Sequence, residues 1–182
     1  MLAEFERDIL LWIHANLRVG ALTPVMRTVS LMGDKGVFWI ALTIVLLLFR
    51  RTRRLGVFCA VSMALTFLAV NCFIKPLVAR VRPYDLFPDL HILTHAEHDF
   101  SFPSGHSANA FAVAWILLRM APKKFGVPAA LLAALMSFSR LYVGVHYPTD
   151  VLAGIAIAVA LAEVTLLLLP RVEAKIARRG KT

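Results

Sequence analysis

The sequence predicts an all-α, polytopic transmembrane helix bundle. Of its 182 residues, 59% are hydrophobic and only 17% are charged, and the mean hydropathy is +0.74, which is unusual for a soluble domain of this size. Residues 55–74 contain no charged residue, and residues 151–169 contain only Glu163. Each segment is long enough to cross a bilayer core as a helix. A single small domain has no room to bury so many apolar helices, so we interpret them as membrane helices.

Five apolar segments qualify as spans. They cover residues 36–49, 55–74, 104–118, 125–143 and 151–169. The first is short, so we expect it to draw on residues 29–32 or to let the flanking Lys35 and Arg50 reach the interface. The polar stretch 75–103 contains four prolines and has no sustained periodicity. That pattern predicts a long loop or cap between the second and third spans.

Two shorter helices are expected before the first span. In residues 2–17 a helical repeat places five apolar residues on one face: Leu2, Phe5, Ile9, Trp12 and Ile13. Such a helix either lies in the membrane interface or packs on the rest of the protein, and the repeat fits both. A second helix is predicted near residues 23–32, with Pro24 at its start.

We therefore predict one membrane-embedded domain over residues 1–182. It comprises interfacial helices in residues 1–33, a transmembrane bundle in residues 36–170 and a basic cytoplasmic tail in residues 171–182.

The charged residues next to the spans predict the topology. Basic residues cluster in residues 50–54, 119–124 and 171–181. With five spans these clusters share one side, and the positive-inside rule makes that side, with the C-terminus, cytoplasmic. The formal net charge of +9 then reflects topology, because the basic residues flank apolar spans, and nucleic acid is not an expected partner.

Three polar segments lie at the opposite, outer ends of the predicted spans. They are residues 75–83, 103–106 and 139–150. Ionisable residues at membrane helix ends are costly and usually functional. Loop charge and polar segments are independent features of the sequence, and both lead to one site on the outer side.

The residue types in these segments predict a phosphate site. Lys75, Arg82 and Arg140 supply three cations, and arginine forms bidentate hydrogen bonds with phosphate oxygens. Ser104 and Gly105 begin the third span, so we expect their backbone N–H groups to face the same anion at the positive end of the helix dipole. Together these groups would stabilise the charge of a phosphoryl-transfer transition state.

Two histidines complete the predicted machinery. Asp150 follows His146 by four residues and can hold its imidazole in one tautomer, which leaves the other nitrogen to attack phosphorus. His106 is placed to protonate the leaving oxygen. The candidate catalytic residues are therefore His146, His106 and Asp150.

These segments resemble the three motifs of the type 2 phosphatidic acid phosphatase family, K-x6-R-P, P-S-G-H and S-R-x5-H-x3-D. Every defined position matches, including Pro83, Pro103 and Ser139, and three spaced motifs in order are far more specific than one short motif. The resemblance implies an all-helical bundle, a phosphohistidine intermediate on His146, protonation by His106, and no metal or other cofactor. The family typically has six core helices, so the N-terminal helices are expected to replace a missing first span.

The resemblance also implies a lipid phosphate or diphosphate as substrate, and we favour undecaprenyl diphosphate. Phosphatidylglycerophosphate, phosphatidic acid and lipid A phosphates stay open as substrates, as does phosphoryl transfer to a second lipid. A catalytically silent lipid-binding or transport protein is the non-enzyme alternative, and the intact His106, His146 and Asp150 argue against it. The expected location is a bacterial-type plasma (inner) membrane, with the site facing outward. The sequence does not indicate an oligomeric state.

The remaining charged residues receive simpler interpretations. Arg80 is expected to anchor a span end at the interface. Histidines and carboxylates cluster in the predicted loop, at His91, His95, Glu97, His98 and Asp99. Their spacing would suit a metal site in a helix, but a solvated loop explains them better, and a role as a lid stays open. Glu163 is expected near the cytoplasmic end of its span, and Trp115 in packing or lipid contact.

Overall fold

A computed structural model describes the backbone of residues 1–179 and the side chains of residues 1–174. Its elements are helices, as predicted. The N-terminal part forms α1 (Leu2–Leu17), α2 (Leu22–Met32), the 3₁₀ turn η1 (Asp34–Gly36) and α3 (Val37–Leu48). The middle forms α4 (Arg53–Phe67), the π-helical η2 (Leu68–Ile74), α5 (Lys75–Val78) and α6 (Pro83–Leu86). Three long helices follow: α7 (Gly105–Met120), α8 (Lys123–Tyr142) and α9 (Pro148–Arg179).

One predicted boundary was wrong. The stretch 75–103 is not all loop, because the helix that includes α4 and η2 continues through α5, and Pro83 begins the short helix α6. Residues 171–179 of the predicted basic tail continue α9 as a helix. The last three residues of that predicted tail, 180–182, lie outside the described part of the chain.

By length and composition alone, the helices of the structure account for fewer than the five predicted spans. Within the described residues, three segments are long and apolar enough to cross a membrane: Arg53–Leu86, Lys123–Tyr142 and Pro148–Ala174. A fourth arises only if α2 and the segment Asp34–Leu48, bent by 51°, count as one. With 16 residues, α7 is roughly 24 Å long, less than the ~30 Å of a bilayer core. Five spans therefore stay a prediction.

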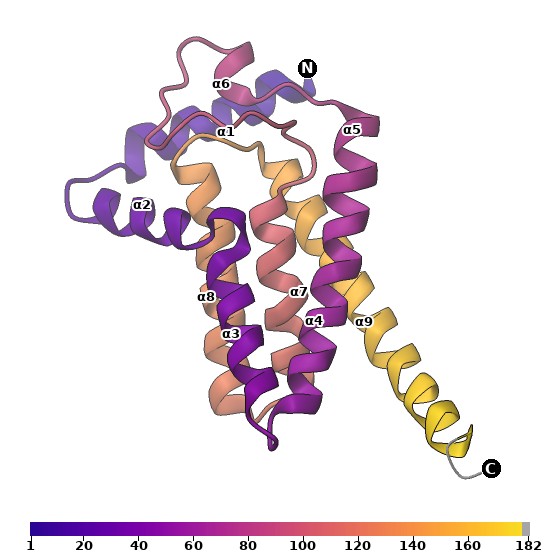
Figure 1. Cartoon of the computed structure of the whole chain (residues 1–182). Coiled ribbons are helices and arrows are strands. Elements are labelled where there is room, and N and C mark those ends of the chain that lie inside the picture. The colour runs from indigo at the N-terminus through magenta and orange to yellow at the C-terminus, as the bar shows by residue number, and fades with distance from the viewer. Residues whose placement is uncertain (180–182) are drawn as a thin grey trace.

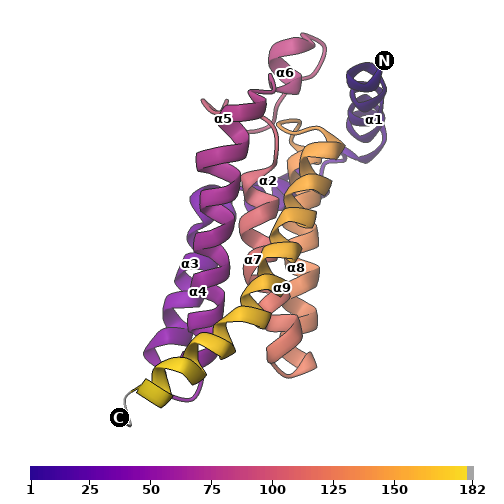
Figure 2. The same cartoon turned by 90° about the vertical axis from the view of Figure 1, so that its right-hand side faces the viewer.

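Helix α7 lies at the centre of the bundle and packs against α4, α8 and α9 (Figures 1 and 2). Its buried surface is rich in small residues, among them Ala108, Ala110, Ala112 and Ala114. Small residues let membrane helices approach closely. On the facing α8, a Cβ added to Gly126 would lie 2.7 Å from the Leu117 carbonyl oxygen. The first turn of this closely packed helix carries two of the predicted site residues, Gly105 and His106.

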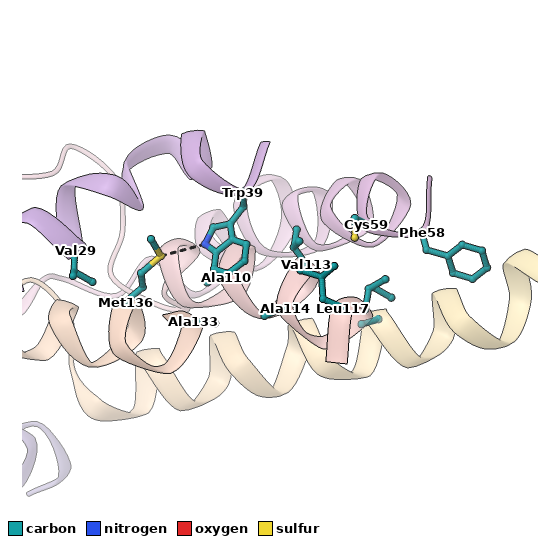
Figure 3. Packing of buried hydrophobic residues seen from close by; sticks show 12 residues of the cluster. Val29, Trp39, Phe58, Cys59, Ala110, Val113, Ala114, Leu117, Ala133 and Met136 are labelled. Carbon is teal, nitrogen blue, oxygen red and sulfur yellow. Dashed lines mark hydrogen bonds between the residues drawn. The ribbon is translucent and has the colours of Figure 1, made fainter. Parts of the chain in front are cut away.

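The largest apolar cluster joins α3 to this central helix (Figure 3). Trp39 of α3 is 1% exposed, and its Nε1 lies 3.2 Å from Sδ of Met136 on α8. Near the C-terminal end of α7, Trp115 Nε1 and Arg119 Nη1 each donate to Glu163 at 2.7 Å. Trp115 is therefore hydrogen-bonded as well as packed, and the lone acidic residue of the fifth predicted span has partners.

The two ends of the bundle differ in chemistry. The α6–α7 loop, the α8–α9 turn and α1 lie at one end, whereas the α3–α4 and α7–α8 connections and the end of α9 lie at the other (Figure 1). The basic residues 50–54 and 119–124 therefore lie opposite the three predicted motif segments.

Helix α1 lies across the motif end and meets it through a different face from the predicted one. Its buried residues are Glu6, Leu10 and Ile13. Leu2, Phe5 and Trp12 of the predicted apolar face are exposed. The helix thus packs on the protein and also presents apolar side chains outward, which combines the two interpretations that the sequence left open. The burial of Glu6 was not predicted.

The contact between α9 and the start of α7 gives a test of the packing. A Cβ added to Gly154 would lie 2.6 Å from the Ser104 carbonyl oxygen, so Gly154→Val must push the helices apart. We expect a loss of about 1–3 kcal/mol in stability, measured as a lower thermal unfolding midpoint in detergent. Gly20→Val is the control, since no atom lies within 4 Å of its added Cβ. Equal midpoints for the two variants would contradict this packing.

Candidate active site

The α8–α9 turn holds His146 with a carboxylate behind it. His146 is 1% exposed, and its Nδ1 lies 3.4 Å from Oδ2 of Asp150 in the first turn of α9. The same oxygen accepts hydrogen bonds from Ser101 Oγ at 2.5 Å and from the Tyr147 N–H at 2.9 Å. These bonds hold the carboxylate in place. An imidazole held at Nδ1 keeps Nε2 available as a nucleophile.

Arg80 lies behind this pair and is not a simple interfacial anchor, so that prediction was wrong. Its Nη1 donates to Asp150 Oδ1 at 2.6 Å, and its Nη2 donates to Glu6 Oε2 at 2.5 Å. Its guanidinium carbon lies 3.8 Å from the centroid of the Tyr147 ring. Sequence reasoning also missed Ser101 and Glu6, because no local pattern marks a residue whose partner is distant in the chain.

A pocket of about 610 Å³ collects five of the predicted site residues at this end of the bundle: Lys75, Arg82, Gly105, His106 and His146. Arg82 is 3% exposed, and its Nη1 donates to the Val145 carbonyl at 2.9 Å and lies 3.4 Å from His146 Nε2. A Cβ added to Gly105 would lie 3.9 Å from Lys75 Nζ. The lysine therefore reaches the first turn of α7.

Arg140 is fully buried beside this pocket. Its Nη1 donates to Ser30 Oγ at 2.5 Å, and its Nη2 is paired with Glu97. Its Nε has no hydrogen-bond partner among the described residues. We call Lys75, Arg82 and Arg140 the cation cluster.

The carboxylates of the α6–α7 loop neutralise the cation cluster. Asp99 is paired with Lys75 and accepts from Arg82 Nη2 at 2.5 Å, while Glu97 is paired with Arg140. The sequence predicted a solvated loop here, but ion pairs hold Glu97 and Asp99 of this loop against the cation cluster. A phosphate that binds the cation cluster must compete with them.

Ser104 contributes differently from the prediction. Its backbone N–H donates to the Asp150 carbonyl at 2.9 Å, so it is not directed at a ligand as expected. Its side chain caps α7 by accepting from the Ser107 N–H at 3.4 Å. The residue therefore links the start of α7 to the start of α9. Gly105, in contrast, lines the pocket.

His106 has a partner that the sequence did not indicate. Its Nε2 lies 2.9 Å from Oδ1 of Asp34 in η1, between α2 and α3. Asp34 also faces His95 and Arg140, each at 3.8 Å. Asp34, His95 and Glu97 have potential ligand atoms within 4.8 Å of one another. Because both carboxylates already face cationic groups, their arrangement fits an ion-pair network better than a metal site.

Burial and charge determine the protonation of the site. Burial lowers the pKa of His146 well below its ordinary value of 6.5, and the cationic side chains of Arg82 and Arg140 lower it further. The imidazole is therefore neutral at pH 7. For Asp99, burial raises the pKa, but the ion pairs with Lys75 and Arg82 outweigh burial and hold the pKa below its ordinary value.

This pKa shift predicts the titration of His146. We expect its imidazole, in protein with ¹⁵N-labelled histidine, to take up a proton only well below pH 6.5, with the signal assigned by its loss in His146→Ala. The unfolded chain binds that proton near pH 6.5, so acidification through this window should also destabilise the fold. A midpoint at or above pH 6.5 would contradict the buried, cation-lined setting.

Comparisons with known proteins indicate the family. Residues 55–173 match the model of the PAP2 superfamily. The chain is 34% identical over 150 residues to an undecaprenyl-diphosphatase of Sulfolobus acidocaldarius, which covers 82% of this chain and 71% of the relative. It is 36% identical over 152 residues to a decaprenylphosphoryl-5-phosphoribose phosphatase of Mycolicibacterium smegmatis, which covers 82% of this chain and 81% of that one.

A solved structure shares the fold. The crystal structure of a transmembrane PAP2-type phosphatidylglycerolphosphate phosphatase from Bacillus subtilis superposes with a TM-score of 0.77 at 28% identity, and the match covers 93% of this chain and 87% of that one. The family match, the membrane-length helices and the relatives together lead to one conclusion. The chain belongs to the PAP2 superfamily and is an integral membrane lipid phosphatase.

Proposed function

We propose that this phosphatase removes the terminal phosphate of a polyprenyl diphosphate, with undecaprenyl diphosphate favoured, at the outer face of a bacterial-type plasma membrane. One observation carries the proposal: a single pocket joins the site to an apolar groove. The groove is lined from α3 by Ile40, Ile44 and Leu47 and from α4 by Ala60, Ala64 and Phe67. A substrate with a charged head and an apolar tail matches both parts.

The groove is accessible from the outside of the bundle. Ile40 is 42% exposed, Ile44 is 50% exposed and Phe67 is 52% exposed. On a membrane protein these side chains face lipid, so a tail in the groove stays in an apolar environment while the phosphate reaches the polar end. This supports a lipid phosphate over a soluble phosphate ester.

The relatives support the choice among lipids. Two of them carry names that specify a polyprenyl-linked phosphate, an undecaprenyl-diphosphatase and a decaprenylphosphoryl-5-phosphoribose phosphatase. Phosphatidylglycerophosphate, phosphatidic acid and lipid A phosphates are the alternative substrates. Transfer to a second lipid and silent lipid binding are the alternative activities, and each predicts a different assay result.

In the proposed reaction, His146 Nε2 attacks the terminal phosphorus and the bond from phosphorus to the bridging oxygen breaks. His106 donates a proton to that oxygen, and Asp150 stabilises the cationic His146. Water then hydrolyses the phosphohistidine with His106 as base. Lys75, Arg82, Arg140 and Gly105 would hold the phosphate, and Ser104 would support the start of α7. Arg140 Nε, which has no partner in the described part of the chain, supports this binding role.

The membrane orientation is part of the proposal. If the apolar helices before and after α7 cross the bilayer, chain continuity requires α7 to return across it between them. This supports five spans, with the N-terminal helices at the interface. The basic segments 50–54 and 119–124, opposite the site, then favour a cytoplasmic side at that end, which includes the C-terminus.

The function is tested by phosphate release from purified lipid phosphates in detergent, with and without EDTA. We expect the highest kcat/KM for undecaprenyl diphosphate, no loss of activity with EDTA, and no release by His146→Ala. A strict need for added divalent metal would contradict the phosphohistidine mechanism. Release that depends on a lipid acceptor would identify a phosphotransferase instead.

The groove is tested by filling it. Ala64→Phe places a ring in the groove and should raise the KM for a long-chain substrate roughly tenfold, since each lost methylene contact is worth ~0.8 kcal/mol. A short-chain phosphate should be unaffected. Ala156→Phe, the same change at an exposed position on α9, is the control. Equal effects on long and short chains would contradict a tail-binding groove.

If Asp99 competes with phosphate for Lys75 and Arg82, removing its charge should strengthen phosphate binding. Asp99→Asn removes the anion from Lys75 and Arg82, so inorganic phosphate should inhibit roughly two- to fivefold more tightly, as expected for a half-exposed ion pair worth ~0.5–1 kcal/mol. Phosphate inhibition constants at neutral pH measure this. Asp89→Asn is the control, because Asp89 pairs with Arg7. Weaker phosphate binding by Asp99→Asn would show that Asp99 supports the site rather than competing for it.

A further inference from the structure

The turn between α2 and α3 is shaped to fit the first turn of α7. A Cβ added to Gly33 would lie 2.9 Å from Cδ2 of His106. Gly36 has a φ of +69°, and a Cβ there would lie 3.2 Å from Nδ2 of Asn109. Glycine permits both the close approach and the left-handed backbone. The turn between these two glycines carries Asp34 directly onto His106.

The contact with Asp34 determines which ring nitrogen of His106 carries a proton. Asp34 Oδ1 lies 2.9 Å from His106 Nε2, and an ionised carboxylate can only accept a hydrogen bond. Nε2 must therefore carry a proton, which leaves Nδ1 as the nitrogen that can exchange one. The side chains of Asp34 and His106 are 26% and 12% exposed, so water screens this pair only in part.

We infer that Asp34 is a positioning residue for the proton transfer by His106. The inference rests on the proposed function and adds a residue to it. With both nitrogens protonated, His106 gives the Nδ1 proton to the leaving oxygen as the phosphorus–oxygen bond breaks and the bond from phosphorus to His146 forms. His106 ends neutral, with its Nε2 proton still donated to Asp34. The carboxylate stabilises the cationic reactant form and holds the ring in one orientation.

The charges around Asp34 are consistent with this role. Arg140 and His95 each lie 3.8 Å from it, and both favour its ionised form. Glu97, which is paired with Arg140, also comes within 4.8 Å. Asp34 lies outside residues 55–173, the part that matches the family model. A motif comparison therefore does not identify it.

The test is Asp34→Asn with substrates that differ in leaving group. Asparagine can still accept from Nε2 but has no charge. A lipid monophosphate such as phosphatidic acid releases an alkoxide, a poor leaving group that needs a proton, so its kcat/KM should fall roughly 10²-fold, within the range of general acid catalysis. A short aryl phosphate with an acidic phenol needs no proton, and its kcat/KM should fall less than about threefold. Retained aryl phosphate turnover also shows that the variant is folded.

Three further variants complete the experiment. His106→Asn should show the same dependence on leaving group, and adding Asp34→Asn to it should cause no further loss. Asp34→Glu, which restores the charge, should recover part of the lipid phosphate activity. Asp89→Asn, which removes a surface carboxylate paired with Arg7, should leave both substrates unchanged.

The outcomes separate the two proposals. An equal loss on both substrates by Asp34→Asn, or no loss on either, overturns the role of Asp34 and leaves the phosphatase function intact. An additional loss in the double variant also overturns it, because Asp34 would then act independently of His106. The proposed function itself fails if His146→Ala still releases phosphate.

Discussion

Three cationic side chains lie close together and largely buried at one end of a membrane helix bundle, and much of the surrounding structure compensates for their charge. A buried charge without a partner destabilises a protein by several kcal/mol. Asp99 neutralises Lys75 and Arg82, and Glu97 neutralises Arg140. These pairs draw the α6–α7 loop onto the site. A phosphate is also an anion, so in the proposed function it would replace these carboxylates on the cation cluster.

A series of polar contacts connects His146 to the N-terminal helix α1. His146 faces Asp150, Asp150 accepts from Arg80, and Arg80 is paired with Glu6 of α1. This arrangement explains why an otherwise amphipathic helix buries a glutamate and leaves Leu2 and Phe5 exposed. The N-terminal helix thereby supports the orientation of the histidine while presenting apolar side chains outward, where a membrane interface would receive them.

The central helix α7 carries site residues at its start and packs against the apolar helices along its length. Its first turn carries Gly105 and His106, and its buried alanines bring α4, α8 and α9 close together. The groove between α3 and α4 opens into the same pocket. In the proposed function, the head group of the substrate lies at the helix ends of this pocket and its tail lies along the sides of α3 and α4.

The membrane class, the helical segments and the motif residues could be predicted from the sequence, because apolar runs and fixed spacings are properties of the linear chain. Lys75, Arg82 and His106 were found in this way. Only the tertiary structure decided which partners these residues have. Asp34 is 72 positions from His106 and Glu6 is 74 positions from Arg80, so no local pattern could reveal either contact. The Ser104 N–H likewise donates to the Asp150 carbonyl, because the packing of α9 on α7 brings the two groups together. Such packing cannot be predicted from the sequence of either segment alone.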